Sequence, residues 1–385
     1  MINTGPAHLG SARSLQGVRA IHRWGIVALS GLLLGLVVWV WPVLPIGAGA
    51  SRASDSVSGA EVLARIVAAG NRPYSGYVET TGTLALPVAS RFTDVGELLG
   101  ETTLTRVWWR DASDWRVNKL LAAGETDLIH RGEQTTEWSY ESAEATVYRD
   151  PDIRLPRTSD LLPPALGARA AVDADRDDVQ RIEDRVVAGR RALGVRLRPV
   201  STSASIDHVD VWADEASGHA LRLEVYVAGA AVPSFTSEFR EFSAQRPAAA
   251  ATAFAAPASA KLSYDDVLDI ADAANQFSEA TPPARLGGLE QAEQTRGAVG
   301  VYGSGMTQLV AIPLWERAAE PFRDQLRTST AVQYLPEGTA LTIGPLAVLL
   351  TEYDDGSGWL LAGTVTQQTL RIAAPRLPPV AHDHD

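Results

Sequence analysis

The stretch HVDVWADEASGHALRLEVYVAG, residues 208–229, decides the fold of this chain. Apolar and polar residues alternate on both sides of residues 214–218, which predicts two antiparallel strands joined by a turn. Gly218 suits the end of this turn, because glycine adopts positive φ without strain. One face of the ribbon is then apolar, with aliphatic residues facing one another in two pairs: Val211 with Leu221, and Val209 with Leu223.

An earlier part of the chain repeats this pattern. TLTRVWWR and DWRVNKLLA flank the polar residues 110–114, and the expected cross-strand pairs are Trp109 with Trp115 and Val107 with Val117. Two hairpins that each have one apolar face predict an antiparallel sheet with a single buried side.

Other segments extend this sheet or cover it. Further strands are expected at residues 136–148, 182–187, 192–199 and 235–242. Residues 59–69 have apolar side chains at helical spacing, and Gly70 ends the predicted helix. The stretch LPRTSDLLPPALGARAA, residues 155–171, predicts a loop and a short helix that packs over the apolar face.

Residues 245–260 are rich in alanine and proline and predict a linker. A second, smaller α+β domain is expected at 261–376, followed by a flexible tail at 377–385. Its first helix is predicted to be capped by Ser263, with Asp266 three residues later. The expected elements after it are a hairpin turning at 303–305, a helix at 315–326, a hairpin turning at 354–358 and a helix at 367–373.

The N-terminus predicts a membrane anchor. Residues 1–23 are basic, and residues 24–46 carry no charge and are almost wholly apolar. A helix of this length crosses a hydrocarbon core of roughly 30 Å. The basic flank places the first residues in the cytoplasm and the bulk of the chain outside. A cleaved signal peptide is the alternative, because Ala48, Gly49 and Ala50 precede Ser51 with the spacing of a cleavage site.

Charge and composition exclude several classes of function. The formal net charge is −12, although residues 1–52 contribute four arginines and no acid. An acidic domain does not favour contact with nucleic acid phosphates. The chain has no cysteine, which excludes a thiolate nucleophile, a cysteine zinc site and a lipidated cysteine.

No motif predicts catalysis, a metal or a cofactor. The sequence around Gly303 and Gly305 lacks the spacing of a nucleophile elbow and is typical of a turn. His382 and His384 form a weak metal site at best, and the acids at 173–178 lack the glycine and glutamate of a calcium loop. Three further histidines are interpreted as isolated: His130, His208 and His219.

Several segments together resemble the N-terminal domain of the MucB/RseB proteins, which is similar to the lipoprotein carriers LolA and LolB. These are the helix before YSGYVET, the hairpin RVWWRDASDWRVNKL, EWSYES, the stretch at 208–229 and SFTSEFREF. The resemblance covers residues 59–243. GVYGSGMTQLVAIPL and LLTEYDDGSGWLLAGTV in the second domain resemble the smaller C-terminal domain of RseB.

The resemblance implies an α+β chain in which residues 58–244 form an unclosed antiparallel β-barrel around a helical plug. Members of this family bind lipoproteins or acyl chains, and RseB restrains proteolysis of a membrane anti-sigma factor. An anchor of its own distinguishes this chain from the soluble periplasmic relatives.

The apolar concave face is therefore the candidate ligand site, and the alternative is a core filled by the two helices. The residues expected on this face are Val107, Trp109, Trp115, Val117, Trp138, Tyr140, Val209, Val211, Leu221 and Leu223.

The sequence favours a non-enzymatic, membrane-anchored extracytoplasmic sensor or regulator. It would bind a lipoprotein or acyl chain and modulate an anti-sigma factor or similar partner. A lipid or lipoprotein carrier in cell-envelope assembly is the alternative. Two further hypotheses are an enzyme of unknown type, such as a hydrolase, and a purely structural envelope protein.

Overall fold

The computed structural model describes residues 57–84, 93–121, 124–151, 153–264, 270–276, 278–293, 295 and 297–380. The basic segment 1–23, the predicted anchor 24–46 and the pair His382 and His384 lie outside the described residues. Within the described part, no helix combines the length and the hydrophobicity that a bilayer span needs.

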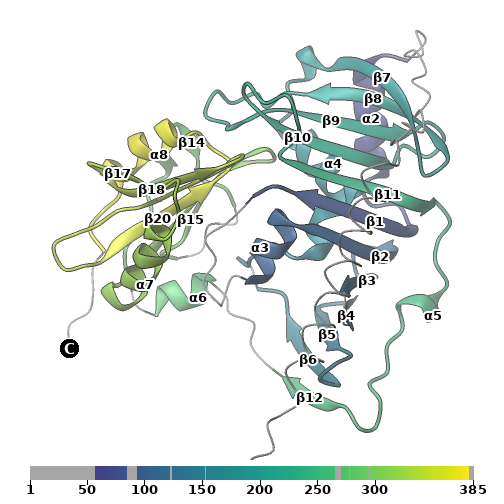
Figure 1. Cartoon of the computed structure of the whole chain (residues 1–385), viewed down its shortest axis with the longest axis horizontal. Helices are drawn as coiled ribbons and strands as arrows, with labels where there is room; N and C mark the ends of the chain where they lie inside the picture. Colours follow the sequence, from purple (N-terminus) through teal and green to yellow (C-terminus); the bar gives the residue numbers. More distant parts are fainter. Residues whose placement is uncertain are drawn as a thin grey trace, which may run out of the picture. The chain divides into compact units, whose positions relative to one another are not determined.

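One sheet of 12 strands forms the first domain (Figure 1). Its strand order is β12-β6-β5-β4-β3-β2-β1-β11-β10-β9-β8-β7, and every neighbouring pair is antiparallel except β12 with β6. β7 and β12 end the sheet and do not pair with each other, so the sheet is unclosed, as predicted. The strands are β1 Tyr74–Gly82, β2 Thr102–Asp111, β3 Asp114–Leu121, β4 Gly124–Arg131, β5 Gln134–Ser139, β6 Glu144–Arg149, β7 Gln180–Val187, β8 Arg190–Leu197, β9 Ile206–Asp214, β10 Ala220–Val227, β11 Phe235–Ser243 and β12 Lys261–Tyr264.

Helices cover the inner face of β8–β11 (Figure 1). The predicted helix at 59–69 is α2, Gly59–Ala69, and the side chain of Ser58 caps it by accepting from the N–H of Glu61 at 3.2 Å. The predicted loop and helix at 155–171 are η1, Thr158–Leu161, and α4, Pro163–Val172. The other helices of this domain are α3 Thr93–Gly100, η2 Arg176–Asp178 and α5 Ala249–Thr252.

The β2–β3 hairpin confirms its predicted register. Trp109 pairs with Trp115 and Val107 with Val117, and a bulge next to Trp109 shortens the turn to a link between Asp111 and Asp114.

The predicted pairs of the β9–β10 hairpin are wrong by two residues. Val211 pairs with Leu223, and Val209 pairs with Val225. The turn closes at Ala213 and Ala220, and a bulge between Ala220 and Arg222 absorbs one more residue of β10. The turn and the bulge together shift the pairing by two residues. Because this number is even, Leu223 stays on the predicted face of the sheet.

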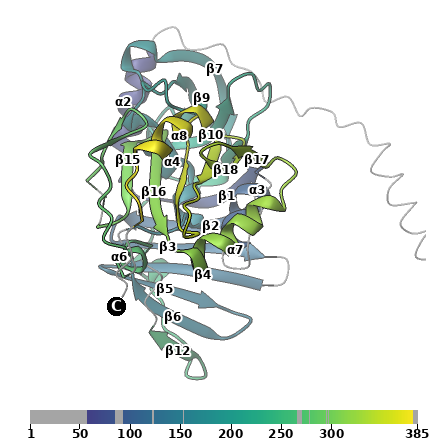
Figure 2. The same cartoon turned by 90° about the vertical axis from the view of Figure 1, so that its left-hand side faces the viewer.

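The predicted linker is largely docked on the sheet. Arg246 pairs with Asp111 at 2.8 Å, and the carbonyl of Pro247 accepts a hydrogen bond from Arg110 at 3.1 Å. Phe254 packs against Trp138, with ring centroids 5.5 Å apart. We call residues 246–264 the strap; it ends in β12, which lies beside β6 in both views (Figures 1 and 2).

Ser263, the predicted helix cap, belongs to β12, Lys261–Tyr264, which extends the first sheet. Residues 265–269, which include Asp266, lie outside the described residues, so the cap stays a prediction. The next described helix is α6, Ile270–Asn275.

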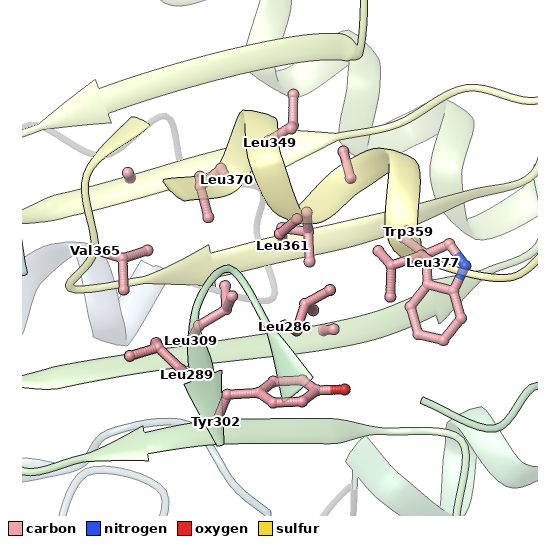
Figure 3. Close-up of a cluster of buried hydrophobic side chains, with 14 of the residues drawn as sticks. Leu286, Leu289, Tyr302, Leu309, Leu349, Trp359, Leu361, Val365, Leu370 and Leu377 are labelled. Atoms are coloured by element: carbon pink, nitrogen blue, oxygen red, sulfur yellow. The ribbon is translucent and has the colours of Figure 1, made fainter. Parts of the chain in front are cut away.

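The second domain is an antiparallel sheet of six strands in the order β15-β16-β20-β19-β18-β17. The predicted hairpins at 303–305 and 354–358 are present, and so are both predicted helices. One sheet face packs against α8 around Trp359, Leu309 and Leu361 (Figure 3), and the other packs against α7. The elements are β13 Arg285–Leu286, β14 Leu289–Glu290, β15 Gly300–Ser304, β16 Thr307–Leu314, α7 Glu316–Arg327, β17 Gln333–Leu335, β18 Gly338–Ile343, β19 Leu346–Leu350, β20 Gly358–Gly363, α8 Gln367–Ala373 and η3 Ala374–Arg376.

Buried carboxylates paired with arginines stabilise the first sheet. Asp214 accepts two hydrogen bonds from Arg190, at 2.8 and 2.9 Å, and two more from the N–H and hydroxyl of Ser217. Burial acts to raise the pKa of Asp214, but these donors outweigh it and leave that pKa below its usual value. Asp214 thereby joins the β9–β10 turn to Arg190, the first residue of β8.

Gly218 is expected to tolerate alanine less well than Gly229, although their φ angles are nearly equal, at 78° and 76°. A Cβ at Gly218 would lie 2.7 Å from the carbonyl oxygen of Arg65 in α2, whereas a Cβ at Gly229 meets nothing within 4 Å. In urea unfolding, Gly229→Ala should cost about 1 kcal/mol from backbone strain alone. Gly218→Ala should cost about 1–3 kcal/mol more, from overpacking. Equal losses would contradict this close contact between α2 and the turn.

Asp214→Asn is expected to lower the free energy of unfolding at pH 7 by about 1–3 kcal/mol. Because the folded-state pKa of Asp214 lies below the unfolded value of about 3.9, its contribution is complete above that pH. The contribution disappears as the pH falls through the folded-state pKa, so the deficit of the variant should shrink below about pH 4. Urea unfolding across this range measures it. Glu133→Gln breaks an ion pair whose side chains are 77% and 81% exposed, and it should change little at any pH.

Candidate functional site

Four aromatic rings form a stacked row across the inner face of β1–β4. Tyr74, Trp109, Trp115 and His130 occupy paired positions on successive strands. Their ring centroids are 5.9, 5.5 and 5.2 Å apart in that order, with interplanar angles of 8°, 5° and 13°. We call this row the aromatic ladder. It gives the concave face a flat, rigid wall with little side-chain freedom.

Polar groups complete one end of the aromatic ladder. Nδ1 of His130 lies 2.9 Å from the hydroxyl of Thr135, which donates to Asp150 at 2.7 Å. Since the hydroxyl proton goes to Asp150, Nδ1 of His130 carries a proton. Burial holds the pKa of His130 below its usual value, so the ring stays neutral at pH 7. Arg157 is hydrogen-bonded to Asp150 and lies over the ring of Trp115, 5.3 Å from its centroid.

Trp109 has an unused polar group within the aromatic ladder. Its indole nitrogen is buried and has no hydrogen-bond partner among the described residues. An indole N–H can only donate, and a buried donor without an acceptor costs about 1–3 kcal/mol. A carbonyl or ester oxygen would satisfy it.

The other half of the concave face is aliphatic. Val209, Val211 and Leu223 belong to one buried cluster with residues of α2 and α4. α4 approaches the sheet closely at Gly167, where an added Cβ would lie 2.9 Å from the Cβ of Ala220. Leu221, at the β10 bulge, belongs instead to the buried cluster around Val107, Trp115 and Val117.

The structure brings eight of the ten predicted site residues into these two buried clusters or against them. Seven of them are at most 4% exposed, and Trp109 packs partly exposed against the cluster of Leu221. The concave face is therefore covered by the chain's own helices in this structure. Their role in binding a ligand stays a prediction.

Trp138 and Tyr140 are not on the concave face, and their predicted placement there is wrong. Val117 pairs with Leu128, and Leu128 pairs with Glu137, so Glu137 points inward and Trp138 outward. Trp138 packs under the strap, and the hydroxyl of Tyr140 lies 3.5 Å from Asp127 on the same outer side. β4 fixes this register, and no strand was predicted from its residues, 124–131.

The C-terminal end of α4 holds the second domain. Asp173 accepts hydrogen bonds from the N–H of Met306 at 2.7 Å and the hydroxyl of Thr307 at 2.9 Å. Arg169 donates to the carbonyl of Gly305 at 3.0 Å and also bonds to the side chain of Gln308. We call this set of contacts the α4 junction. Both sheets belong to the compact unit Gly49–Asp385.

The sequence did not reveal the α4 junction. Asp173 is one of the acids at 173–178, whose pattern does not match a calcium loop, but the structure gives it two specific partners, Met306 and Thr307. Nothing in the local pattern marks Asp173 or Arg169, because their partners lie more than 130 positions later in the chain.

An open cleft of about 550 Å³ lies beside the α4 junction. Arg169 and Val172 line it on one side, and Glu290 and Ser304 line it on the other. Its lining carries both charges, from Arg169, Glu290 and Glu293. In this it differs from the apolar concave face.

The other two histidines among the described residues lie in separate surroundings. His208 pairs with Asp207 and stacks on Tyr226, whereas His219 contacts Tyr74 and the carbonyl of Arg72. In the same part of the chain, no group of three or more His, Cys, Asp or Glu is placed to hold a metal ion.

Comparisons with known proteins give remote matches only. No family model and no curated protein matches the chain. The Pseudomonas aeruginosa MucA/MucB complex contains a chain that is 16% identical over 84% of this chain and 99% of that chain, with a TM-score of 0.46. MucB alone is 13% identical over 82% and 96%, with a TM-score of 0.44. A LolA superfamily protein from Nitrosomonas europaea is 10% identical over 52% and 99%, with a TM-score of 0.24. This chain is similar to MucB and, more remotely, to LolA superfamily proteins.

Asp173→Ala is expected to free the β15–β16 turn. The variant removes the acceptor for the N–H of Met306, and a hydrogen bond to a charged group contributes about 1.5–3 kcal/mol. Hydrogen–deuterium exchange of peptides covering Met306 and Thr307 should therefore accelerate about tenfold or more. Asp177→Ala removes the same charge four residues away, in η2, and should leave this exchange unchanged. Equal protection in both variants would rule out Asp173 as the residue that holds the turn.

Proposed function

We propose that this chain is a non-enzymatic regulator, held at the membrane by residues 24–46 with its folded part outside the cytoplasm. The first domain binds an apolar ligand, either an acyl chain or the lipid group of a lipoprotein. The second domain acts on a membrane protein partner. The observation that carries this proposal is the double contact of α4.

The two contacts of α4 lie at different places along the helix. Gly167, Ala170 and Ala171 face the concave side of the sheet, and Arg169 and Asp173 hold the β15–β16 turn. The buried residues of α4 are two prolines, a glycine and two alanines, and Leu166 packs partly buried against the aliphatic cluster of Val209, Val211 and Leu223, which is the floor under this helix. An acyl chain that took the place of α4 would bury the same aliphatic side chains.

Ligand binding then changes the α4 junction by population shift. A ligand that occupies the floor under α4 favours the state in which α4 has moved away, and that state lacks the contacts of Asp173 and Arg169. The unpaired indole N–H of Trp109 offers a donor for an ester or amide carbonyl at the head of an acyl chain. The second domain would thus change its docking when ligand is present.

An anti-sigma factor in the membrane is the partner that we propose for the second domain. The sequence motifs in both domains resemble RseB, whose role implies such a partner, and the predicted anchor keeps this chain beside membrane proteins. A tethered protein cannot carry cargo far, which favours regulation over transport. A mature protein that begins at Ser51 and is released would instead favour the carrier alternative.

Residues 49–385 are expected to bind an acyl chain, and Gly167→Val is expected to increase this binding. The added side chain cannot fit against Ala220, so it pushes α4 from the floor and lowers the cost of ligand entry. Titration with a fluorescent fatty acid should show at least fivefold tighter binding for the variant, and Gly167→Ala should lie between the two. Native mass spectrometry after expression with membranes should detect a bound lipid. A lipid-free spectrum together with no uptake by any of the three proteins would contradict the proposal.

A further inference from the structure

The β15–β16 turn of the second domain inserts a methionine into the first domain. β15 ends at Ser304 and β16 begins at Thr307, so Gly305 and Met306 form the tip of this hairpin. Met306 is 4% exposed. It belongs to the aliphatic cluster under α2 and α4, whose other buried members all lie between residues 62 and 223. Met306 is therefore part of the cover of the concave face.

The second sheet does not use Met306 for its own packing. Buried clusters around Trp359, Val301 and Leu350 pack this sheet, and among the described residues Met306 belongs to none of them. The open cleft of about 550 Å³ is lined by residues 303–305, so one side of the turn faces space. Withdrawal of Met306 would thus leave the core of the second domain complete.

The side chain of methionine is suited to a reversible insertion. It is unbranched and flexible, and it resembles a short length of an alkyl chain. Its burial beside Val209, Val211 and Leu223 removes the same kind of apolar surface from water as an acyl chain would. Because protein interiors are close-packed, an acyl chain that fills this cluster cannot lie where Met306 lies.

We propose that Met306 is a plug of the acyl-chain site: an acyl chain enters the aliphatic cluster by taking the place of the Met306 side chain, and this detaches the β15–β16 turn. The inference rests on the function proposed above and adds that the second domain supplies part of the ligand site. Docking of the turn and binding of an acyl chain then oppose each other, and each weakens the other by the same factor.

A second contact keeps the domains together when the plug leaves. The carbonyl of Ser203 accepts a hydrogen bond from the N–H of Thr366 at 2.8 Å, and the N–H of Ser205 donates to the carbonyl of Thr364 at 3.2 Å. These bonds join the loop after β8 to the segment after β20, and they do not involve the β15–β16 turn. Displacement of Met306 is therefore a local movement of one hairpin tip.

Oxidation of Met306 reports directly on the plug. The chain has only two methionines, Met1 and Met306, and dilute hydrogen peroxide converts an accessible methionine to its sulfoxide. Mass spectrometry of the peptide that contains Met306 gives the rate in the full chain. Hexadecanoate should raise this rate about fivefold or more, with the same concentration dependence as its binding. Butanoate carries the same carboxylate but buries little apolar surface, and it should leave the rate unchanged.

Two pairs of variants separate the plug from a general loosening of the fold. Without ligand, Asp173→Ala should raise the oxidation rate because it frees the turn, whereas Asp177→Ala should not. Met306→Ala removes the competing side chain, so it should bind hexadecanoate about fivefold more tightly or better. Met306→Leu fills a similar volume and should stay within about twofold of the unchanged chain. Circular dichroism checks that each variant is folded.

The outcomes distinguish this inference from the function on which it rests. Hexadecanoate that binds without a change in the oxidation of Met306 overturns the plug and leaves the proposed function standing. Equal affinity of Met306→Ala and Met306→Leu has the same meaning. If neither the unchanged chain nor Met306→Ala binds hexadecanoate, the proposed function fails and the plug fails with it.

Discussion

The structure depends on one constraint: a sheet that does not close must have its inner face covered. The 12 strands curve without joining β7 to β12, so valines and leucines on the inner side of β8–β10 would face water without a cover. Each such side chain contributes roughly 1.5–3 kcal/mol when it is buried. α2 and α4 provide this cover.

The two covering helices are held in different ways. α2 contributes Val62, Leu63 and Ile66, which are at most 3% exposed and insert into the aliphatic cluster. α4 contributes mainly alanines, one glycine and two prolines, and its position is fixed as much by the α4 junction as by burial. α4 contacts both the aliphatic cluster and the β15–β16 turn, so it joins the inner face of the first sheet to the second domain. The loop after β8 contacts this domain as well, because the N–H of Ser205 donates to the carbonyl of Thr364 at 3.2 Å. In the function that we propose, α4 is the element that changes state.

Much of the fold is predictable from local sequence, and the candidate site is predictable only in part. Strict alternation identifies β2, β3, β9 and β10, and helical spacing identifies α2 with its bounds, because in each case the buried face dictates the pattern. β4 has an inner row of Thr126, Leu128 and His130, which does not alternate clearly, and so the strand is not apparent from the sequence. Without β4 the register of β5 is undetermined, and Trp138 falls on the wrong face. The α4 junction and the docking of the strap depend on partners far away in the chain, which local patterns do not record.

The docked strap also limits how far the second domain can travel. Between Tyr264, the last residue of β12, and Ile270, the first of α6, the chain has only six peptide steps, or about 20 Å when fully extended. If the α4 junction opens while the strap stays in place, the two partners of Asp173 remain within a small volume around it. Their effective concentration is then in the millimolar range typical of short tethers. Re-docking should consequently be fast, and the system would respond to the loss of its signal as readily as to its arrival.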